Sequence, residues 1–181
     1  MPAKTSRFEA ELFRPAGAPE DSSWAFLVLP KTVSDTLPRR GRTTVEGTIC
    51  GQVFQTTLDP DGQLSHWLKV SGSLLEATGV SFGDKVEIEL WPVAVEPEPE
   101  VPVDLDEALS GSPDARKTWE DTTKIARLDW IHWIESAKQT KTRQKRVLNA
   151  CDMLAKGKKR VCCFDPSGFY SKAFKAPVVA D

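Results

Sequence analysis

The chain has 181 residues, of which 40% are hydrophobic and 28% are charged, and its net charge at pH 7 is −2. This composition is ordinary for a soluble protein, and the length allows one domain or two small ones. No run of about 18 apolar residues is present, which excludes a membrane-spanning helix. The N-terminal stretch MPAKTSRFEAELF lacks the apolar core of a secretory signal. We therefore expect a cytoplasmic protein.

Short segments of alternating or continuous apolar residues dominate the first half of the chain. They predict six strands, at residues 7–14, 24–29, 43–50, 52–58, 63–70 and 85–91. Brief helices are predicted within KTVSDTL and SLLEATGV, and Asp61–Gly62 is a typical hairpin turn. Six short strands with many turns favour a small β-barrel, because closure of the sheet removes its exposed edges.

The sequence of this β-rich half resembles a known family. The stretch GRTTVEGTICGQVFQTTLDPDGQLSHWLKVSGSLLEATGVSFGDKVEIEL is similar to a small-barrel domain of unknown function that accompanies YdeI-type modules. Its last part, TGVSFGDKVEIEL, also looks like the half-barrel of AbrB/MazE-type swapped-hairpin proteins. The resemblance implies a double-split β-barrel at residues 6–92. It concerns fold alone, since a shared fold does not carry a function with it.

A linker is predicted at residues 93–103, where prolines alternate with glutamates. Proline favours extended backbone and the glutamates repel one another, which together predict a semi-rigid spacer. Two short helices follow, and then the longest helical pattern of the chain, residues 123–160. It contains one helix with a broad apolar face, a break at residues 138–140, and a second helix that Thr140 or Thr142 caps. Gly157 ends that helix.

This helical half also resembles a known family. The stretch WIESAKQTKTRQKRVLNACDMLAKGKK looks like the C-terminal module of the YdeI/OmpD-associated, or bacteriocin-protection, family. The matching positions are Trp133, Ile134, Ala137, Lys138, Thr142, Arg143, Arg146, Leu154, Gly157 and Lys158. The resemblance implies an α-helical domain at residues 104–160, followed by a tail at 161–181. The whole chain is therefore predicted to be α+β, with a barrel first and a helical module second.

Basic residues are concentrated in the helical half. Residues 138–160 contain nine basic residues and one acidic residue, a net charge of +8. Such a segment attracts phosphates, anionic headgroups or an acidic protein face, although lysines and arginines also simply solvate an exposed helix. The candidate residues for an anionic partner are Lys138, Lys141, Arg143, Lys145 and Arg146. A small basic loop, Arg39–Arg42, adds a second cluster of positive charge.

The barrel offers a weaker candidate site. Trp24, Arg42, His66 and Lys69 are the candidate ligand-binding residues if they meet at one mouth of the barrel, where small-molecule sites tend to form. Strict alternation places His66 and Lys69 on opposite faces of a strand, so the cluster requires a bulge or twist. A lone histidine between Leu64 and Leu68 is more often a hydrogen-bonded core residue.

Catalytic and metal-binding patterns are weak. The four cysteines form no C-x-x-C pair, the neighbours Cys162 and Cys163 are a poor clamp for a metal ion, and only two histidines are present. We expect free thiols in a reducing cytosol, and neither a metal site nor a cofactor. No nucleophile elbow or glycine-rich phosphate loop occurs. The sequence assigns no catalytic residue.

Three hypotheses about function follow. The first is a non-enzymatic binding or stress-resistance protein of the bacteriocin-protection type, with an unknown small molecule or protein as partner. The second is a nucleic-acid-binding protein that uses the basic helical pair, although a pI of about 5.8 is low for such a protein. The third is an enzyme with its site at the barrel mouth. The sequence leaves the oligomeric state open.

Overall fold

The computed structural model describes residues 4–19, 23–162 and 164–181. Cys163, whose state the sequence left open, lies outside these residues. The backbone divides into two compact units, Met1–Val95 together with Pro166–Asp181, and Glu96–Asp165. We call them the barrel unit and the helical unit and describe each by itself. The predicted α+β class, with a barrel at the N-terminal end and helices after it, is confirmed.

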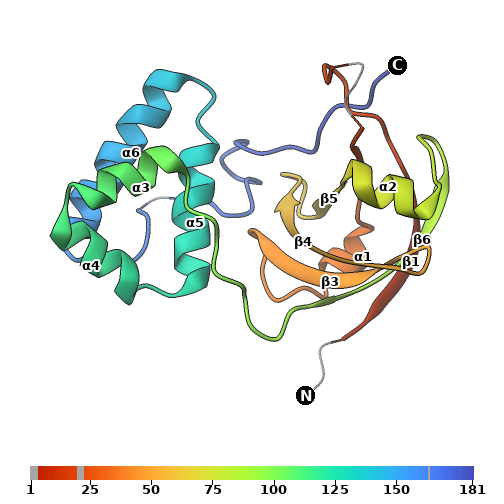
Figure 1. The fold of residues 1–181 in the computed structure, drawn as a ribbon, viewed down its shortest axis with the longest axis horizontal. Helices are drawn as coiled ribbons and strands as arrows, with labels where there is room; N and C mark the ends of the chain where they lie inside the picture. The colour runs from red at the N-terminus through yellow and green to blue at the C-terminus, as the bar shows by residue number, and fades with distance from the viewer. Residues whose placement is uncertain (1–3, 20–22, 163) are drawn as a thin grey trace. The chain divides into compact units, whose positions relative to one another are not determined.

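The barrel unit is one antiparallel sheet of six strands (Figure 1). The elements are β1 Ser6–Glu11, β2 Ala25–Val28, α1 Lys31–Ser34, β3 Thr43–Ile49, β4 Gln52–Pro60, β5 His66–Val70, α2 Gly72–Thr78 and β6 Lys85–Pro92. The strand order is β1-β6-β3-β4-β5-β2. All six predicted strands are present, because each alternates buried and exposed residues or is buried along its length.

The barrel is nearly closed, because two pairs of neighbouring strands share few hydrogen-bonded positions. Strands β1 and β2, at the two ends of the sheet, are joined beyond β1 by the single bridge Phe13↔Phe26, whose N···O distances are 2.8 and 3.0 Å. Strands β4 and β5 pair at only two positions, Asp59↔Trp67 and Pro60↔His66. Strands β3 and β4 pair along seven residues. Most of the sheet is therefore continuous, and two splits interrupt it.

Aliphatic side chains fill the inside of the barrel. The largest fully buried ones are Leu12, Leu27, Ile49, Leu58, Leu68, Ile88 and Leu90. On β6 the buried residues Val86, Ile88 and Leu90 alternate with charged ones, as the period of a strand requires. The interior is consequently a packed core, and it stabilises the unit mainly by burying apolar surface.

The connection between β4 and β5 differs from the sequence prediction. Strand β4 continues to Pro60 and β5 begins only at His66, so the predicted turn through Asp61–Gly62 is part of a loop at residues 61–65. The carboxylate of Asp61 organises it by accepting the N–H groups of Gln63 at 2.7 Å and Ser65 at 2.9 Å. A side chain that bonds to the backbone two and four residues ahead holds a wider turn than a hairpin motif alone indicates.

The C-terminal segment is part of the barrel unit. Pro15 pairs with Val179, and the N–H of Ala180 donates to the carbonyl of Arg14 at 2.8 Å. Gly62, with φ +77°, has no room for a side chain, since a Cβ there would lie 2.0 Å from the carbonyl oxygen of Phe174. The tail therefore lies against the loop between β4 and β5, and a glycine permits this close approach.

Four helices make up the helical unit (Figure 1). They are α3 Val103–Ser110, α4 Pro113–Asp121, α5 Lys124–Glu135 and α6 Thr140–Ala155. Their core includes Leu105, Trp119, Trp130, Ile134 and Leu154. Helix α5 is buried on more than one side, because Leu128, Trp130 and Ile131 are all buried. This agrees with the broad apolar face predicted for it.

The ends of these helices are set by local signals, with one exception. The Thr123 side chain caps α5 by accepting the N–H of Ala126 at 3.1 Å. Gly157, with φ +86°, ends α6, and the N–H of Lys158 donates to the carbonyl of Met153 as in a Schellman motif. Neither Thr140 nor Thr142 caps α6, because the helix already begins at Thr140 and no side chain accepts a hydrogen bond at its Gln139 cap.

An ion pair holds the acidic linker within the helical unit. Glu98 forms an ion pair with Arg127, whose side chain is mostly buried. Arg127 also donates to the carbonyl of Thr122 at 2.8 Å. The segment before α3 is thus held to the start of α5. No helix among the described residues is long and apolar enough to cross a membrane.

Candidate functional site

His66 lies inside the barrel unit and is fully buried, as is Ser34. Its Nε2 atom is 2.8 Å from the carbonyl oxygen of Gly41, which can only accept, so Nε2 carries the proton. Nδ1 then accepts a hydrogen bond from the Ser34 hydroxyl at 2.7 Å. Burial lowers the pKa of His66 below its ordinary value, which keeps the ring neutral.

The hydrogen-bond partners of His66 could not be predicted from the sequence. Ser34 lies in a short helix and Gly41 in a loop, and neither forms a motif with the histidine. A serine hydrogen-bonded to a histidine resembles a nucleophile with its base. The side chains of Ser34 and His66 are nevertheless buried. The neighbouring Ser65 does not bind this pair, because its hydroxyl donates to the carbonyl of Leu29 at 2.8 Å. This arrangement ties α1, β5 and the loop at Gly41 together.

The other barrel candidates form separate contacts. The ammonium of Lys69 lies 4.6 Å from the centre of the Trp24 ring, a cation–π contact. The guanidinium of Arg42 lies 2.6 Å from the carboxylate of Asp59. Lys69 is exposed and His66 is buried, so the two residues point to opposite faces of β5, as alternation requires. The structure pairs Trp24 with Lys69 but does not add His66 to that pair.

The arginine loop is held to its own unit. The side chain of Arg39 donates to the carbonyl of Arg42 at 2.9 Å. That of Arg40 donates to the carbonyl of Leu64 at 2.7 Å and lies 2.8 Å from the Asp35 carboxylate. With Arg42 bound to Asp59, each of the three arginines has a contact inside the barrel unit. These contacts position the loop, and carboxylates offset much of its positive charge.

In the helical unit, two of the five predicted basic residues connect helices. Arg143 on α6 binds Asp104 on α3 through two hydrogen bonds of 2.8 and 3.2 Å. These bonds hold the pKa of Asp104 below its usual value. Arg146 donates to the carbonyl of Trp133 at 2.6 Å and to the Ser136 hydroxyl at 2.9 Å. It thereby satisfies the carboxyl end of α5.

The remaining three, Lys138, Lys141 and Lys145, are exposed. Lys141 and Lys145 are one helical turn apart on α6, and Lys138 precedes its first turn. That turn contains no acidic residue and no capping side chain. Because the N-terminus of a helix carries partial positive charge, the lysines and the helix end together favour an anion. Leu148, on the next turn, is 68% exposed.

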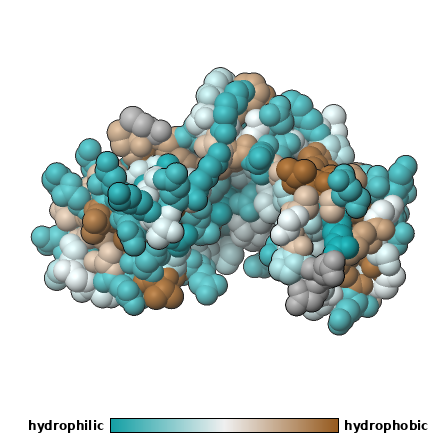
Figure 2. Space-filling model, turned by 90° about the horizontal axis from the view of Figure 1, so that it is seen from above, coloured by the Kyte–Doolittle hydropathy of each residue, from teal (hydrophilic) through white to brown (hydrophobic). Residues whose placement is uncertain are grey.

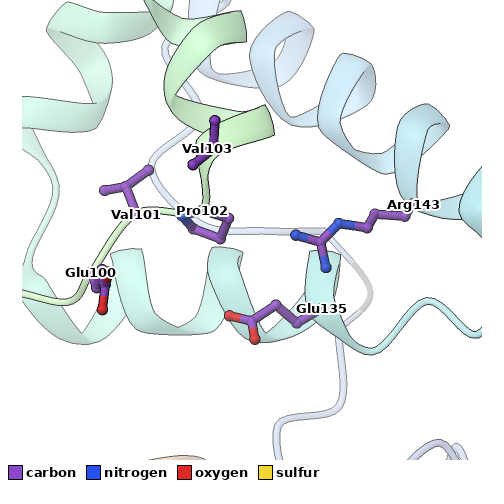
Figure 3. Close-up of a pocket in the computed structure, with 6 residues that line it drawn as sticks. All are labelled: Glu100, Val101, Pro102, Val103, Glu135 and Arg143. Atoms are coloured by element: carbon purple, nitrogen blue, oxygen red, sulfur yellow. The ribbon is translucent and has the colours of Figure 1, made fainter.

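A cavity of about 380 Å³ lies in the helical unit. It is lined by Glu100, Val101, Pro102 and Val103 before and at the start of α3, by Glu135 at the end of α5, and by Arg143 on α6. In Figure 3, Arg143 extends from α6 and Glu135 from α5 toward the space beside the Glu100–Val103 segment. Of the ion pair between Arg143 and Asp104, the arginine alone is a lining residue.

Hydrophobic groups do not merge into one large patch on the face drawn in Figure 2, where they appear as separate spots on a mostly hydrophilic surface.

The fold and these contacts define a two-unit α+β protein. It joins a nearly closed β-barrel to a four-helix unit that carries an exposed lysine cluster and a small cavity.

Comparison with protein families gives a match for each unit. Residues 98–157 match the family described as Bacteriocin-protection, YdeI or OmpD-Associated. Residues 8–90 match the Domain of unknown function DUF1905. Each of these two families thus matches one segment of the chain, and the resemblances to the YdeI/OmpD-associated family and to the small-barrel domain are confirmed. A search of curated proteins found no match.

Proposed function

We propose that this chain is a non-enzymatic, cytoplasmic binding protein of the bacteriocin-protection type, and that its helical unit binds an anionic partner. The proposal rests on a difference among the basic residues at the start of α6: the arginines bind the helical unit itself, whereas the lysines are exposed. Arg143 and Arg146 bind groups of the helical unit itself. Lys138, Lys141 and Lys145 are exposed at the helix end that favours anions.

Several features of the barrel unit favour binding over catalysis. Its one buried histidine is neutral and has hydrogen bonds at both ring nitrogens. The serine beside it is as deeply buried, so a substrate would need the core to open. The match to a family described by protection and association supports a protein that acts by binding.

A charge-matched pair of variants tests the proposal. Lys141→Glu/Lys145→Glu reverses two charges at the start of α6, and Lys158→Glu/Lys159→Glu reverses two beyond its end. Retention on a heparin column at low salt is the measurement, since contacts between lysines and a polyanion weaken steeply with salt. We expect the first variant to elute at clearly lower salt than the wild type, and the second to elute close to it.

Two outcomes of the heparin experiment would contradict the proposal. Equal losses in both variants would mean that diffuse charge, and not the start of α6, attracts the anion. A wild-type protein that is not retained at low salt would also overturn it.

Nucleic acid remains the alternative partner, favoured by the exposed lysines alone. A short DNA duplex titrated at two salt concentrations distinguishes it, because phosphate contacts give a steep salt dependence. The arginine loop of the barrel adds little to this alternative, because Arg40 and Arg42 already pair with Asp35 and Asp59.

A further inference from the structure

The cavity of the helical unit is not explained by the lysine cluster. Its volume of about 380 Å³ lies within the range of small-molecule sites. Three separate parts of the chain form it: the segment leading into α3, the end of α5 and the second turn of α6. Three of its six lining residues, Glu100–Pro102, lie in the segment before α3, and the other three belong to α3, α5 and α6.

The charges at the cavity are mostly negative. Arg143 is its only lining cation among the described residues, and the two hydrogen bonds that it donates to the Asp104 carboxylate fix the guanidinium and offset its charge. Glu100 and Glu135 add two carboxylates to the lining. The lining therefore holds two carboxylates and one guanidinium, a net charge of −1, and the guanidinium is also bound to the Asp104 carboxylate. A cation is the ligand that this balance attracts.

One wall of the cavity is apolar. Val101 and Pro102 are half-buried, and Val103 is 74% exposed although it lies at the start of a helix. Figure 3 shows these three residues next to one another, with Glu100 to their left and Glu135 below Pro102. A flexible chain of methylene groups would cover this wall and remove apolar surface from water.

From this combination we propose that the cavity is a binding site for an aliphatic ammonium compound, such as a diamine. Its methylene chain lies along Val101–Val103, and its ammonium groups are held by Glu100 and Glu135. Arg143 also lines the space, and its hydrogen bonds to Asp104 hold the guanidinium in place. The site is independent of the lysine cluster, which attracts the opposite charge.

Isothermal titration calorimetry of the full chain with 1,5-diaminopentane tests the inference. Two compounds of the same carbon length serve as controls, 1,5-pentanediol without charge and glutarate with negative charge. We expect measurable binding of the diamine alone. Absence of diamine binding at millimolar concentration, or equal binding of the diol, would overturn the proposal.

Variants locate the site. Glu135→Gln and Glu100→Gln each keep the size of the side chain and remove one carboxylate, and we expect each to weaken diamine binding by about tenfold. Glu107→Gln is the matched control, because Glu107 is an exposed glutamate of α3 outside the cavity lining. If Glu107→Gln weakened binding as much as the other two, the general negative charge and not the cavity would bind the amine, and the proposal would be wrong.

Discussion

At the scale of single residues, His66 is the buried group with the most direct consequence for stability. Folding transfers it from water to the barrel core, where burial lowers its pKa from an ordinary 6.5. Protonation then opposes folding, because the unfolded chain binds the proton more readily. Stability contributed by the neutral ring is present above the ordinary pKa and decreases as the pH falls below it.

We therefore expect the free energy of unfolding to fall between about pH 7 and pH 5, by at most about 1.4 kcal/mol per pH unit for this one proton. Urea unfolding at the two pH values measures it. His66→Gln keeps a donor for Gly41 but cannot titrate, so its decrease should be smaller than that of the wild type. Equal decreases in the two proteins would assign the pH dependence to other groups.

A second prediction at the residue scale concerns Gly62. Gly62→Ala places a Cβ 2.0 Å from the carbonyl oxygen of Phe174 at a φ of +77°. Gly79, with φ +70°, has no atom within 4 Å of the same position. Both substitutions strain the backbone, but only the first displaces the tail.

We expect Gly79→Ala to cost about 1 kcal/mol and Gly62→Ala more than about 2 kcal/mol. Chemical denaturation measures both values. Limited trypsin digestion at Lys172 and Lys175 should also become faster in Gly62→Ala alone. Equal costs in the two variants would show that the tail adds nothing to the stability of the barrel unit.

At the scale of secondary structure, α6 separates two kinds of basic residue. Val147, Ala150 and Leu154 face the core, and Arg143 and Arg146 lie beside this buried stripe. Lys141 and Lys145 lie away from it and are exposed. The helical period accounts for this difference, since residues three and four apart share a face.

Arg146→Ala should consequently destabilise the helical unit, while Lys145→Ala should not. The first removes hydrogen bonds to the Trp133 carbonyl and the Ser136 hydroxyl, together with a guanidinium 5.4 Å from the Trp133 ring centre. We expect a loss of about 1–3 kcal/mol for Arg146→Ala and less than about 0.5 kcal/mol for Lys145→Ala. Thermal unfolding followed by far-ultraviolet circular dichroism measures both. A similar loss in both variants would contradict the assignment of Arg146 to the end of α5.

Patterns of period and turn residues predicted most of the secondary structure. Helix α6 ends where Gly157 indicated, and β6 follows its alternation of buried and charged residues. A turn was predicted after Pro60 but its extent was not, because this depends on which backbone groups the Asp61 carboxylate reaches. Local sequence indicates that a turn exists, while its length depends on such contacts.

Contacts between residues that are far apart in the sequence could not be predicted from it. The bonds of His66 to Ser34 and of Arg143 to Asp104 join positions 32 and 39 residues apart. No periodicity links such residues, and only the packing of their elements brings them together. The basic cluster was therefore predicted as a group of five, and the contacts of the folded chain divided it into two arginines and three lysines.

At the scale of the whole molecule, the two units have separate cores. The barrel core draws on residues between Leu12 and Leu90, and the helical core on residues between Leu105 and Leu154. The barrel unit takes residues from both ends of the chain, whereas the helical unit is one continuous segment, Glu96–Asp165. A continuous segment with its own core meets the usual condition for independent folding.

We accordingly expect the fragment 96–165 to fold alone, because the ion pairs Arg127–Glu98 and Arg143–Asp104 and the buried Trp130 all lie inside it. Its far-ultraviolet circular dichroism should be helical and its thermal unfolding cooperative. The fragment 1–95 lacks the tail that pairs with Pro15 and packs at Gly62, so it should unfold at lower urea concentration than the barrel unit of the full chain. A fragment 96–165 without helical structure would show that its core depends on the barrel unit, and the diamine and heparin experiments would then report on the intact chain only.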